Sequence, residues 1–231
     1  MPVAPNGKAV GVPSRVRRRT GLLLEPHGGT MSTVKLAIVY YSATGTVDAM
    51  AHRAAAAGEK AGAEVRLRRV AREATSGERQ ATEAQAAHAE AAPEVPAATA
   101  DDIVWADAVL FGSPTRYGNI AGQLKTFIDS LGPQWGQGLL ADKVYAGFTS
   151  SQTLHGGQES TLLALYNTIH HFGGIVVAPG YTDPTKFVDG NPYGASHVTG
   201  ANNDAPLGDA ENAALDHLAT RVVTVAGKLA G

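Results

Sequence analysis

Short hydroxyl-bearing and glycine residues gather directly after the first strongly apolar segment of the chain, residues 34–41. The next six residues read Ser-Ala-Thr-Gly-Thr-Val (42–47). Side chains this small allow backbone N–H groups and hydroxyls to point at one spot, and a helix that begins there adds the positive end of its dipole. Such a segment can bind an anion without a cationic side chain. The alternative is an ordinary helix N-cap that is rich in Ser and Thr.

The same segment lacks the features that select larger phosphate ligands. No Lys follows Gly45, so the segment is not a Walker loop for a triphosphate and magnesium. The chain also lacks the G-x-G-x-x-G pattern that binds the pyrophosphate of a dinucleotide. We therefore expect a terminal monophosphate at residues 42–47.

Two further clusters of small polar residues follow apolar segments in the same way. Residues 112–119 read Gly-Ser-Pro-Thr-Arg-Tyr-Gly-Asn, and residues 149–157 read Thr-Ser-Ser-Gln-Thr-Leu-His-Gly-Gly. Arg116 is either a ligand-binding residue or a partner in a surface ion pair. The glycine-rich residues 132–138 contain Trp135, which either lines a binding site or anchors its own loop.

Composition and charge narrow the classes of function. The chain has 231 residues, no Cys, and a formal net charge of −2 from 19 basic and 21 acidic residues. This balance disfavours nucleic acid and anionic membranes as partners. Without Cys the chain cannot form a thiolate nucleophile, a Cys-ligated iron–sulfur cluster or a Cys-type zinc site. We expect no metal site. Redox chemistry would therefore need a bound organic cofactor. A helix needs about 20 consecutive apolar residues to span a bilayer, and no segment of the sequence approaches this length. We expect a cytoplasmic protein without integral membrane association.

Two stretches of the chain look unlike a folded core. Residues 1–30 contain several Pro and Gly without a sustained period, and we expect a disordered N-terminal extension before a single domain at residues 31–231. An Arg-rich transit peptide is the alternative for this extension. Residues 71–100 are rich in Ala, Glu, Gln and Thr, which indicates a loosely ordered, variable insertion.

Elsewhere, apolar segments alternate with segments of helical period. A more exposed edge strand is expected at 63–70, and we interpret its arginines, Arg66, Arg68 and Arg69, as a solvated face. Residues 181–206 are predicted to be irregular. Buried strands are predicted at 34–39, 108–111, 144–149 and 175–178. Helices are predicted at about 46–61, 120–131, 158–172 and 209–229.

This alternation predicts an α/β fold. Five parallel strands in the order 2-1-3-4-5, with helices on both faces, make a doubly wound, flavodoxin-like sheet. Ligands of such sheets bind beyond the carboxyl ends of the strands, where the strand order reverses. The polar segments at 42–47, 112–119 and 149–157 follow the first, third and fourth strands, so we expect them to form one site. A phosphate-binding loop with small polar loops and mobile aromatic residues suits a flat cofactor, and FMN fits best.

Several motifs resemble those of WrbA-type NAD(P)H:quinone oxidoreductases. They are Y-Y-S-x-T-G-T from residue 40, G-S-P-T-R-Y-G-N from residue 112 followed by G-Q-L-K-T-F-I-D, Trp135 in its glycine-rich loop, G-G-Q-E from residue 156, H-H-x-G from residue 170, and N-P-Y-G-A from residue 191. The resemblance covers nearly all of residues 31–231. The pattern P-T-R-[FY]-G-N, combined with the other motifs, is specific to this family.

The resemblance implies roles for individual residues. It places the FMN phosphate on Ser42, Ala43, Thr44, Gly45, Thr46 and Val47. It places the flavin ring against Pro114, Thr115, Arg116, Tyr117, Gly118 and Asn119. The loop that would close over the ring and the ribityl chain consists of Ser150, Ser151, Gln152, Thr153, Leu154 and His155.

The same resemblance implies a homotetramer in which each site is completed between subunits. His171 would reach the flavin of a neighbouring subunit; by residue type alone, His170 and His171 could equally stabilise the C-terminus of their helix. Trp135 would form the wall against which nicotinamide and quinone stack in turn. Thr44 stands where many members have an aromatic residue that touches the nicotinamide, so substrate contact is expected there as well.

The activity that the resemblance implies is FMN-dependent, two-electron reduction of quinones by NADH or NADPH in a ping-pong cycle. One alternative is a flavodoxin-type electron carrier that passes single electrons to a protein partner. The near-neutral net charge argues against the acidic docking face of such a carrier. The other alternative is a regulatory flavoprotein of the same fold without quinone reductase activity.

Overall fold

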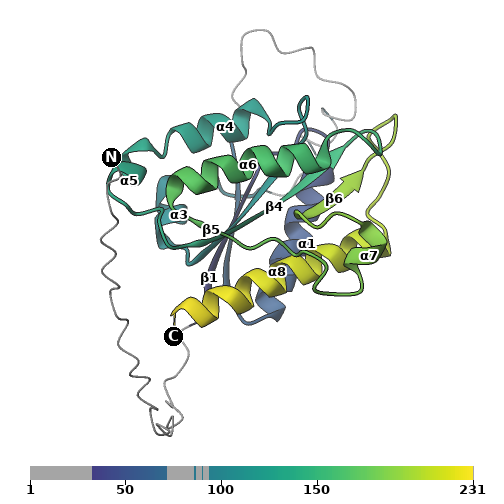
Figure 1. Ribbon diagram of the computed structural model, residues 1–231. Coiled ribbons are helices and arrows are strands. Elements are labelled where there is room, and N and C mark those ends of the chain that lie inside the picture. Colours follow the sequence, from purple (N-terminus) through teal and green to yellow (C-terminus); the bar gives the residue numbers. More distant parts are fainter. Residues whose placement is uncertain (1–32, 72–85, 87–89, 91–93, 231) are drawn as a thin grey trace, which may run out of the picture. The chain divides into compact units, whose positions relative to one another are not determined.

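The computed structural model describes residues 33–71, 86, 90 and 94–230 (Figure 1). The expected N-terminal extension at 1–30 lies outside the described residues, and so does most of the expected insertion at 71–100. The domain boundary at residue 31 therefore stays a prediction.

A parallel sheet forms the centre of the described chain (Figure 1). Its strands follow one another in the order β2-β1-β3-β4-β5, and each neighbouring pair is parallel. The predicted order 2-1-3-4-5 is confirmed. The five strands are β1 (Lys35–Tyr40), β2 (Glu64–Arg69), β3 (Ala108–Pro114), β4 (Val144–Ser151) and β5 (Ile175–Val176).

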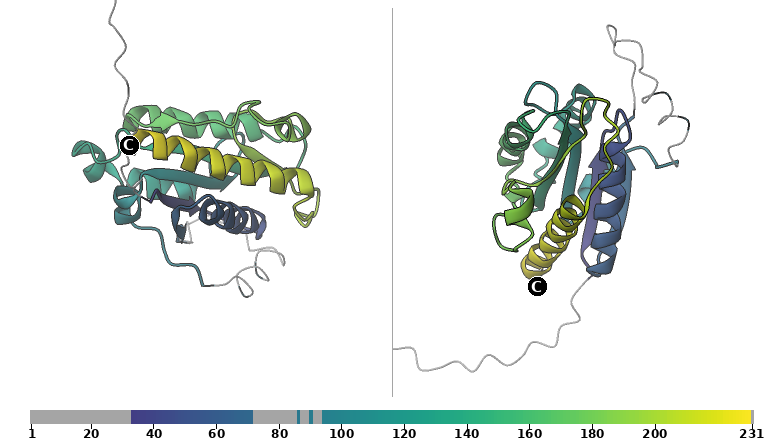
Figure 2. Two further views of the ribbon diagram at one scale, coloured as in Figure 1. Left: turned by 90° about the horizontal axis from the view of Figure 1, so that it is seen from below. Right: turned by 90° about the vertical axis from the view of Figure 1, so that its right-hand side faces the viewer.

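Helices cover both faces of this sheet, as Figure 2 shows. On one face, α1 (Thr46–Lys60) and α8 (Asp209–Ala230) pack against Leu36, whereas the next residue, Ala37, belongs to the core on the other face. Because successive side chains of a strand point to opposite faces, the apolar residues after Lys35 in β1 fill both cores. The helices that pack on the second face are α3 (Ala100–Trp105), α4 (Gly122–Asp129) and α6 (Gln158–Phe172).

The segment at 181–206 is not irregular, and that prediction was wrong. It contains a short helix, α7 (Lys186–Asp189), and a sixth strand, β6 (Ala195–Val198). β6 pairs in parallel with the second half of β4, whereas β5 pairs with the first two residues of β4. Two short strands therefore share the fifth position of the sheet, with residues 177–194 as an excursion between them. Four residues of mixed polarity carry no clear period, so the pairing with β4 decides that β6 is a strand.

β2 is the edge strand, as predicted, but the interpretation of its arginines as a solvated face is wrong for Arg66 and Arg68. Both donate to Asp102 Oδ1, at 3.3 and 3.0 Å. The guanidinium of Arg66 also lies 4.0 Å from the ring centre of Trp105. Asp102 belongs to α3, a helix that the sequence pattern did not predict and that begins with a capping box between Thr99 and Asp102. The edge strand is thus tied to the helix before β3.

Candidate functional site

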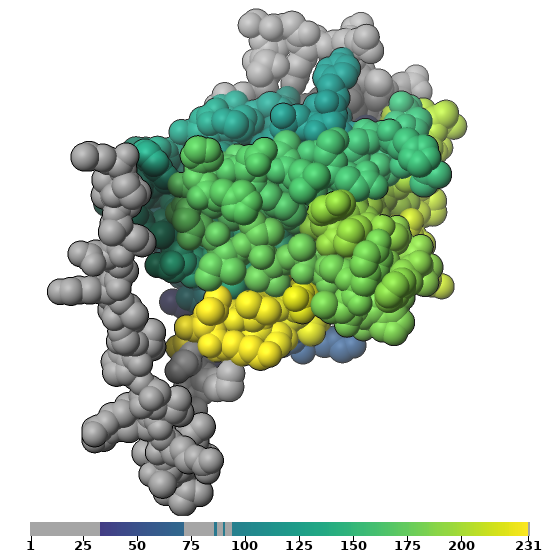
Figure 3. All heavy atoms as spheres, in the orientation of Figure 1, coloured from purple at the N-terminus to yellow at the C-terminus, as the bar shows by residue number. Residues whose placement is uncertain are grey.

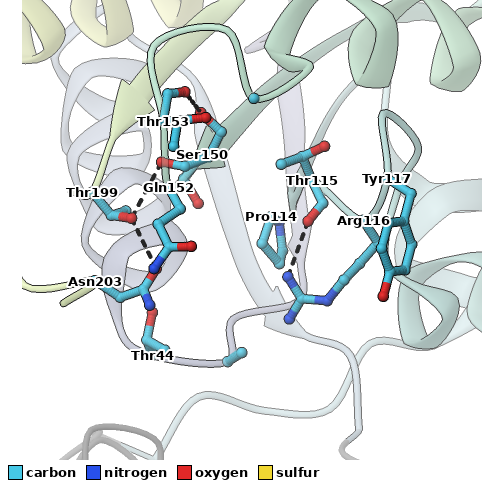
Figure 4. Close-up of a pocket in the computed structure, with 13 residues that line it drawn as sticks. Thr44, Pro114, Thr115, Arg116, Tyr117, Ser150, Gln152, Thr153, Thr199 and Asn203 are labelled. Atoms are coloured by element: carbon cyan, nitrogen blue, oxygen red, sulfur yellow. Dashed lines mark hydrogen bonds between the residues drawn. The ribbon is translucent and has the colours of Figure 1, made fainter. Parts of the chain in front are cut away.

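A cavity of about 380 Å³ opens beside the residues that follow β1, β3, β4 and β6 (Figure 4). All three polar segments that were predicted to converge contribute to it. This edge of the sheet is where doubly wound folds bind their ligands. The residues that line the cavity are Ala43, Thr44, Pro114, Thr115, Arg116, Tyr117, Ser150, Ser151, Gln152, Thr153, Gly156, Thr199 and Asn203.

The loop after β1 leaves the start of α1 open. Gly45 is the N-cap of this helix and has a φ of 101°, a left-handed conformation that side chains rarely adopt. Within the described residues no side chain caps α1. The hydroxyl of Ser42 instead accepts the N–H of Gly45 at 3.2 Å. The first N–H groups of α1 and the positive end of its dipole therefore remain available to an anion.

A buried hydrogen bond closes the base of this loop. The hydroxyl of Tyr40, the last residue of β1, donates to the carboxylate of Asp48 in the first turn of α1. Both side chains are buried. Burial, together with the hydrogen bond to Asp48, raises the pKa of Tyr40 well above its usual range. The hydroxyl stays protonated and holds the two ends of the loop together.

The loop after β3 is a tight turn that exposes an aromatic side chain. Arg116 and Asn119 exchange backbone hydrogen bonds of 2.7 and 3.0 Å. The central residues, Tyr117 and Gly118, have φ values of 53° and 77°, and two positive φ values define a type I′ turn. The hydroxyl of Thr115 accepts the N–H of Gly118 at 3.3 Å and supports the turn from below. Tyr117 is held fully exposed at the rim of the cavity.

The loop after β4 folds around one carbonyl group. The carbonyl of Thr153 accepts hydrogen bonds from Ser151 Oγ at 2.7 Å, from the N–H of Gly156 at 3.0 Å and from Gln158 Nε2 at 3.4 Å. A side chain at Gly156 would not fit, because its Cβ would lie 2.7 Å from the Cβ of Ser151. At this point the cavity wall is therefore bare backbone.

One wall of the cavity, which comes from the loop after β6, was not predicted from the sequence. Thr199 is buried, and its N–H donates to the carbonyl of Ser151 at 2.8 Å. Its hydroxyl lies 2.9 Å from Oδ1 of Asn203, which has a φ of 58°. The run Gly-Ala-Asn-Asn at 200–203 is typical of a turn. Only the pairing of β6 with β4 brings that turn to the cavity.

Contacts on both sides fix the loop after β6. Gln152 Nε2 donates to the carbonyl of Ala201 at 2.6 Å and joins the loop to the one after β4. In β6, the buried His197 places Nδ1 3.3 Å from Oε1 of Glu211. The other oxygen of Glu211 accepts the N–H of Gly208 at 3.1 Å, just before α8. The loop is thus anchored to β4, to β6 and to α8.

Some predicted site residues do not reach the cavity surface. Ser42 and Val47 are each 1% exposed and support the loop after β1 from within the fold. Leu154 and His155, in contrast, are exposed to solvent. The predicted residues of the three loops that do not line the cavity are Ser42, Gly45, Thr46, Val47, Gly118, Asn119, Leu154 and His155.

Comparison with known proteins identifies the family. The family described as NADPH-dependent FMN reductase matches residues 35–184. A protein of Deinococcus radiodurans named NAD(P)H dehydrogenase (quinone) is 48% identical over 199 residues, which cover 86% of this chain and 98% of that protein. The chain belongs to the NAD(P)H dehydrogenase (quinone) family. A Sinorhizobium fredii protein of the same name is 40% identical over 201 residues, which cover 85% of this chain and 98% of that relative.

The fold of this family member has a counterpart among solved structures. A flavodoxin-like, WrbA-like protein from Agrobacterium tumefaciens superimposes with a TM-score of 0.61 and 23% sequence identity, over 85% of this chain and 99% of the other. The predicted flavodoxin-like architecture and the predicted membership of the WrbA-type quinone oxidoreductases are both confirmed. Among the described residues, no helix has both the length and the apolar character needed to cross a membrane.

Two residues that the family resemblance assigned to the site lie away from the cavity within one chain. Trp135 belongs to a short helix, α5 (Gly132–Gly136), and is 55% exposed. Its indole N–H donates to the carbonyl of His171 at 2.7 Å, and both residues line a separate hollow of about 190 Å³. His171 lies in the last turn of α6, and the first turn of α6 follows the loop after β4. Because a helix rises about 1.5 Å per residue, about 20 Å separates the two ends.

The cavity of this family member offers little acid–base chemistry. Of the residues that line it, only Arg116 and Tyr117 carry titratable groups. The guanidinium of Arg116 donates to the carbonyl of Thr115 at 3.0 Å. Within the part of the chain that the structure describes, no group of three His, Asp or Glu side chains could hold a metal ion. Such a site suits a polar ligand that brings its own chemistry.

Proposed function

We propose that this chain is an FMN-dependent NAD(P)H:quinone oxidoreductase that works by a ping-pong cycle. The observation that carries the proposal is the cavity at the strand ends, which is lined by two loops of small polar residues and by Ala43 and Thr44, directly before the open start of α1. The family supports it, because relatives are named NAD(P)H dehydrogenase (quinone) and the matching family is described as NADPH-dependent FMN reductase.

The residues around the cavity fit FMN. The open start of α1 suits a phosphate, because free N–H groups and the helix dipole stabilise an anion. The cavity of about 380 Å³ is lined mainly by short polar side chains and backbone, which suits the polar edge of a planar ring. The phosphate would contact residues 42–47, the ring residues 114–119, and the ribityl chain residues 150–155.

When bound, FMN supplies the redox chemistry, taking two electrons as a hydride from NADH or NADPH and delivering them to a quinone. The chain contributes position and electrostatics. Backbone N–H groups of the loop after β4 would donate to the polar edge of the ring and stabilise negative charge there, because the N–H groups of Arg116, Gly118 and Asn119 in the loop after β3 already have partners. No acid–base pair lines the cavity, so the proton that completes the hydroquinone would come from water, and no side chain would form a covalent bond.

A neighbouring subunit would complete this site. Trp135 is half exposed in one chain, although a large aromatic side chain gains free energy when it is buried. Exposed apolar side chains also gather on the excursion at 177–194, where the rings of Tyr181 and Phe187 lie 4.9 Å apart and Val188 is 74% exposed. Figure 3 shows this excursion beside α6. These surfaces support self-association. The assembly we propose is a cytoplasmic homotetramer in which Trp135 and His171 meet the cavity of another subunit.

A visible absorption experiment tests the activity. FMN is added to the purified protein, followed under anaerobic conditions by NADH or NADPH and then by benzoquinone. We expect the reduced nucleotide to bleach the flavin band and the quinone to restore it. Flavin binding without bleaching by either nucleotide would contradict the reductase and favour the electron carrier. Absence of flavin binding would contradict both.

A further inference from the structure

We propose that the side-chain amide of Asn203, oriented by Thr199, binds the phosphate end of the cofactor. The inference rests on the proposed function and adds a binding residue to the same site. Asn203 lines the cavity from the loop after β6, a segment to which neither the sequence motifs nor the family comparison assigns a ligand.

The fold brings Asn203 to the side of the cavity where α1 begins. β6 runs parallel to β4, so its carboxyl end lies at the same edge of the sheet as the loop after β1. The chain then continues into α8, which packs beside α1 on one face of the sheet. In Figure 4, Asn203 and Thr44 lie on one side of the cavity, and Arg116 and Tyr117 lie on the other. The amide is therefore placed at the end that the start of α1 makes favourable for an anion.

Hydrogen bonds within the wall orient this amide. The hydroxyl of Thr199 lies 2.9 Å from Asn203 Oδ1 and 3.2 Å from the carbonyl of Ser151, so the amide oxygen is the closer acceptor. Nδ2 of Asn203 has no hydrogen bond within the described residues, and its two N–H groups remain for a ligand. The φ of 58° at Asn203 is one that Asn, Asp and Gly adopt with little strain.

The helices α1 and α8 both begin at this edge of the sheet. They differ in whether a side chain of the protein already occupies the N–H groups at the start of the helix, and this difference favours α1 for an anion. Before α8, the carboxylate of Glu211 already accepts the N–H of Gly208 at 3.1 Å. At α1 the N-cap is Gly45, and no side chain caps the helix. A neutral amide beside that open start adds hydrogen-bond donors without adding charge. The ligand chemistry that suits this end is the phosphate monoester of a flavin.

Flavin titrations of two variants and a matched control test the assignment. N203D keeps the size of the side chain and suits the left-handed backbone, but it replaces the donor with a carboxylate. N203G keeps the backbone conformation and removes the side chain. N202D makes the same charge change one residue earlier, on an exposed side chain that does not line the cavity. Dissociation constants are measured by flavin fluorescence, with FMN and with riboflavin, which lacks the phosphate; circular dichroism checks that each variant is folded.

We expect N203D to weaken FMN binding by at least about tenfold and N203G to weaken it by about three- to tenfold, because a hydrogen bond to a charged group is lost and the Asp variant adds like-charge repulsion. The affinity for riboflavin should change by less than about twofold in N203D and in N203G. In N202D, the affinities for FMN and for riboflavin should each change by less than about twofold. Unchanged FMN affinity in N203D, or equal losses for FMN and riboflavin, would overturn the assignment. A wild-type protein that binds no flavin would instead refute the proposed function.

Discussion

The cavity at the strand ends and the corner around Trp135 and His171 are assigned to one site by the family resemblance, yet they are built in opposite ways. Each loop of the cavity has a buried anchor, such as the Tyr40–Asp48 hydrogen bond below the loop after β1. The corner is exposed, and one hydrogen bond, from the indole of Trp135 to the carbonyl of His171, joins its two residues. A single chain therefore builds the cavity, whereas the corner is an exposed surface that would reach a cavity only through the proposed association of subunits.

This difference means that flavin binding and turnover should respond to different substitutions. Changes in the cavity should act mainly on the affinity for FMN. Changes in the corner should act mainly on the reaction of the assembled protein, and only when subunits are associated.

Gly45→Val should have the largest effect, and it should act on the cavity. A β-branched side chain at a φ of 101° costs about 1–3 kcal/mol and distorts the loop, so FMN affinity should fall about 10- to 100-fold in a fluorescence titration. Gly62→Val is the matched control, because Gly62 has a φ of 88° beyond the other end of α1 and nothing lies within 4 Å of its Cβ position. That variant should lose stability but retain its affinity for FMN. Equal losses of affinity would argue against a phosphate at the start of α1.

Trp135→Ala should act on the corner. We expect kcat/KM for a quinone to fall about tenfold, from the loss of roughly 0.5–1.5 kcal/mol of ring stacking in addition to buried area, while FMN affinity changes by less than about threefold. Leu139→Ala, an exposed apolar side chain nearby, is the control and should leave turnover unchanged. A wild-type rate for Trp135→Ala would remove Trp135 from the proposed substrate wall.

Mixed assemblies sharpen this prediction. Gly45→Val and Trp135→Ala subunits can be produced together. The Trp135→Ala subunit keeps an intact cavity, and a neighbouring Gly45→Val subunit can supply Trp135 to it. Quinone reduction by the mixture should then exceed the mean of the two separate variants. A mixture that matches the mean would contradict donation of Trp135 between subunits.

Tyr40→Phe should weaken the anchor below the loop after β1. The substitution leaves the buried carboxylate of Asp48 without this donor, so the free energy of unfolding measured in urea should fall by about 1–3 kcal/mol. FMN affinity should fall less than in Gly45→Val. Unchanged stability would show that the Tyr40–Asp48 contact does not hold the loop.

The same group predicts a pH dependence. Burial raises the pKa of Tyr40 in the folded state, so its contribution is fully present below the unfolded pKa of about 10 and is lost as the pH rises toward the folded value. Burial also raises the pKa of Tyr145 and Tyr166. The wild-type urea midpoint should therefore fall above pH 10, and less steeply in Tyr40→Phe. Parallel curves for the two proteins would contradict the role of Tyr40.

Glu211→Gln should have the smallest effect. Glu211 accepts the N–H of Gly208 and faces His197, so the neutral side chain should lower the free energy of unfolding by about 0.5–1 kcal/mol. FMN affinity should fall about twofold through the looser loop after β6. Asp204→Asn, on an exposed side chain of the same loop, should change neither quantity. If Asp204→Asn lost more stability or FMN affinity than Glu211→Gln, the net charge of the loop, and not the contacts of Glu211, would control these quantities.

Sequence patterns identified the three loops of the cavity because each follows a strand with a mainly apolar run, and the order of such strands fixes which loops meet. They did not identify which residues within a loop face the cavity. Thr44, for example, lines the cavity while Ser42 is buried, although both are small hydroxyl residues of the same loop. Thr199 and Asn203 were missed because β6 is a strand only through its pairing with β4. The assignment of Trp135 and His171 came from the family resemblance, and a single chain does not bring them to the cavity.

The division of the fifth sheet position between β5 and β6 gives the cavity an edge whose pairing is independent of β5. β5 pairs with Val144 and Tyr145, whereas β6 pairs with the part of β4 that carries the cavity loop. We therefore expect residues 195–208 to unfold locally, when their hydrogen bonds break, without loss of the pairing of β5. A ligand bound against Asn203 would stabilise the closed form by mass action. Hydrogen exchange of the β6 amides would then report how fully the site is occupied.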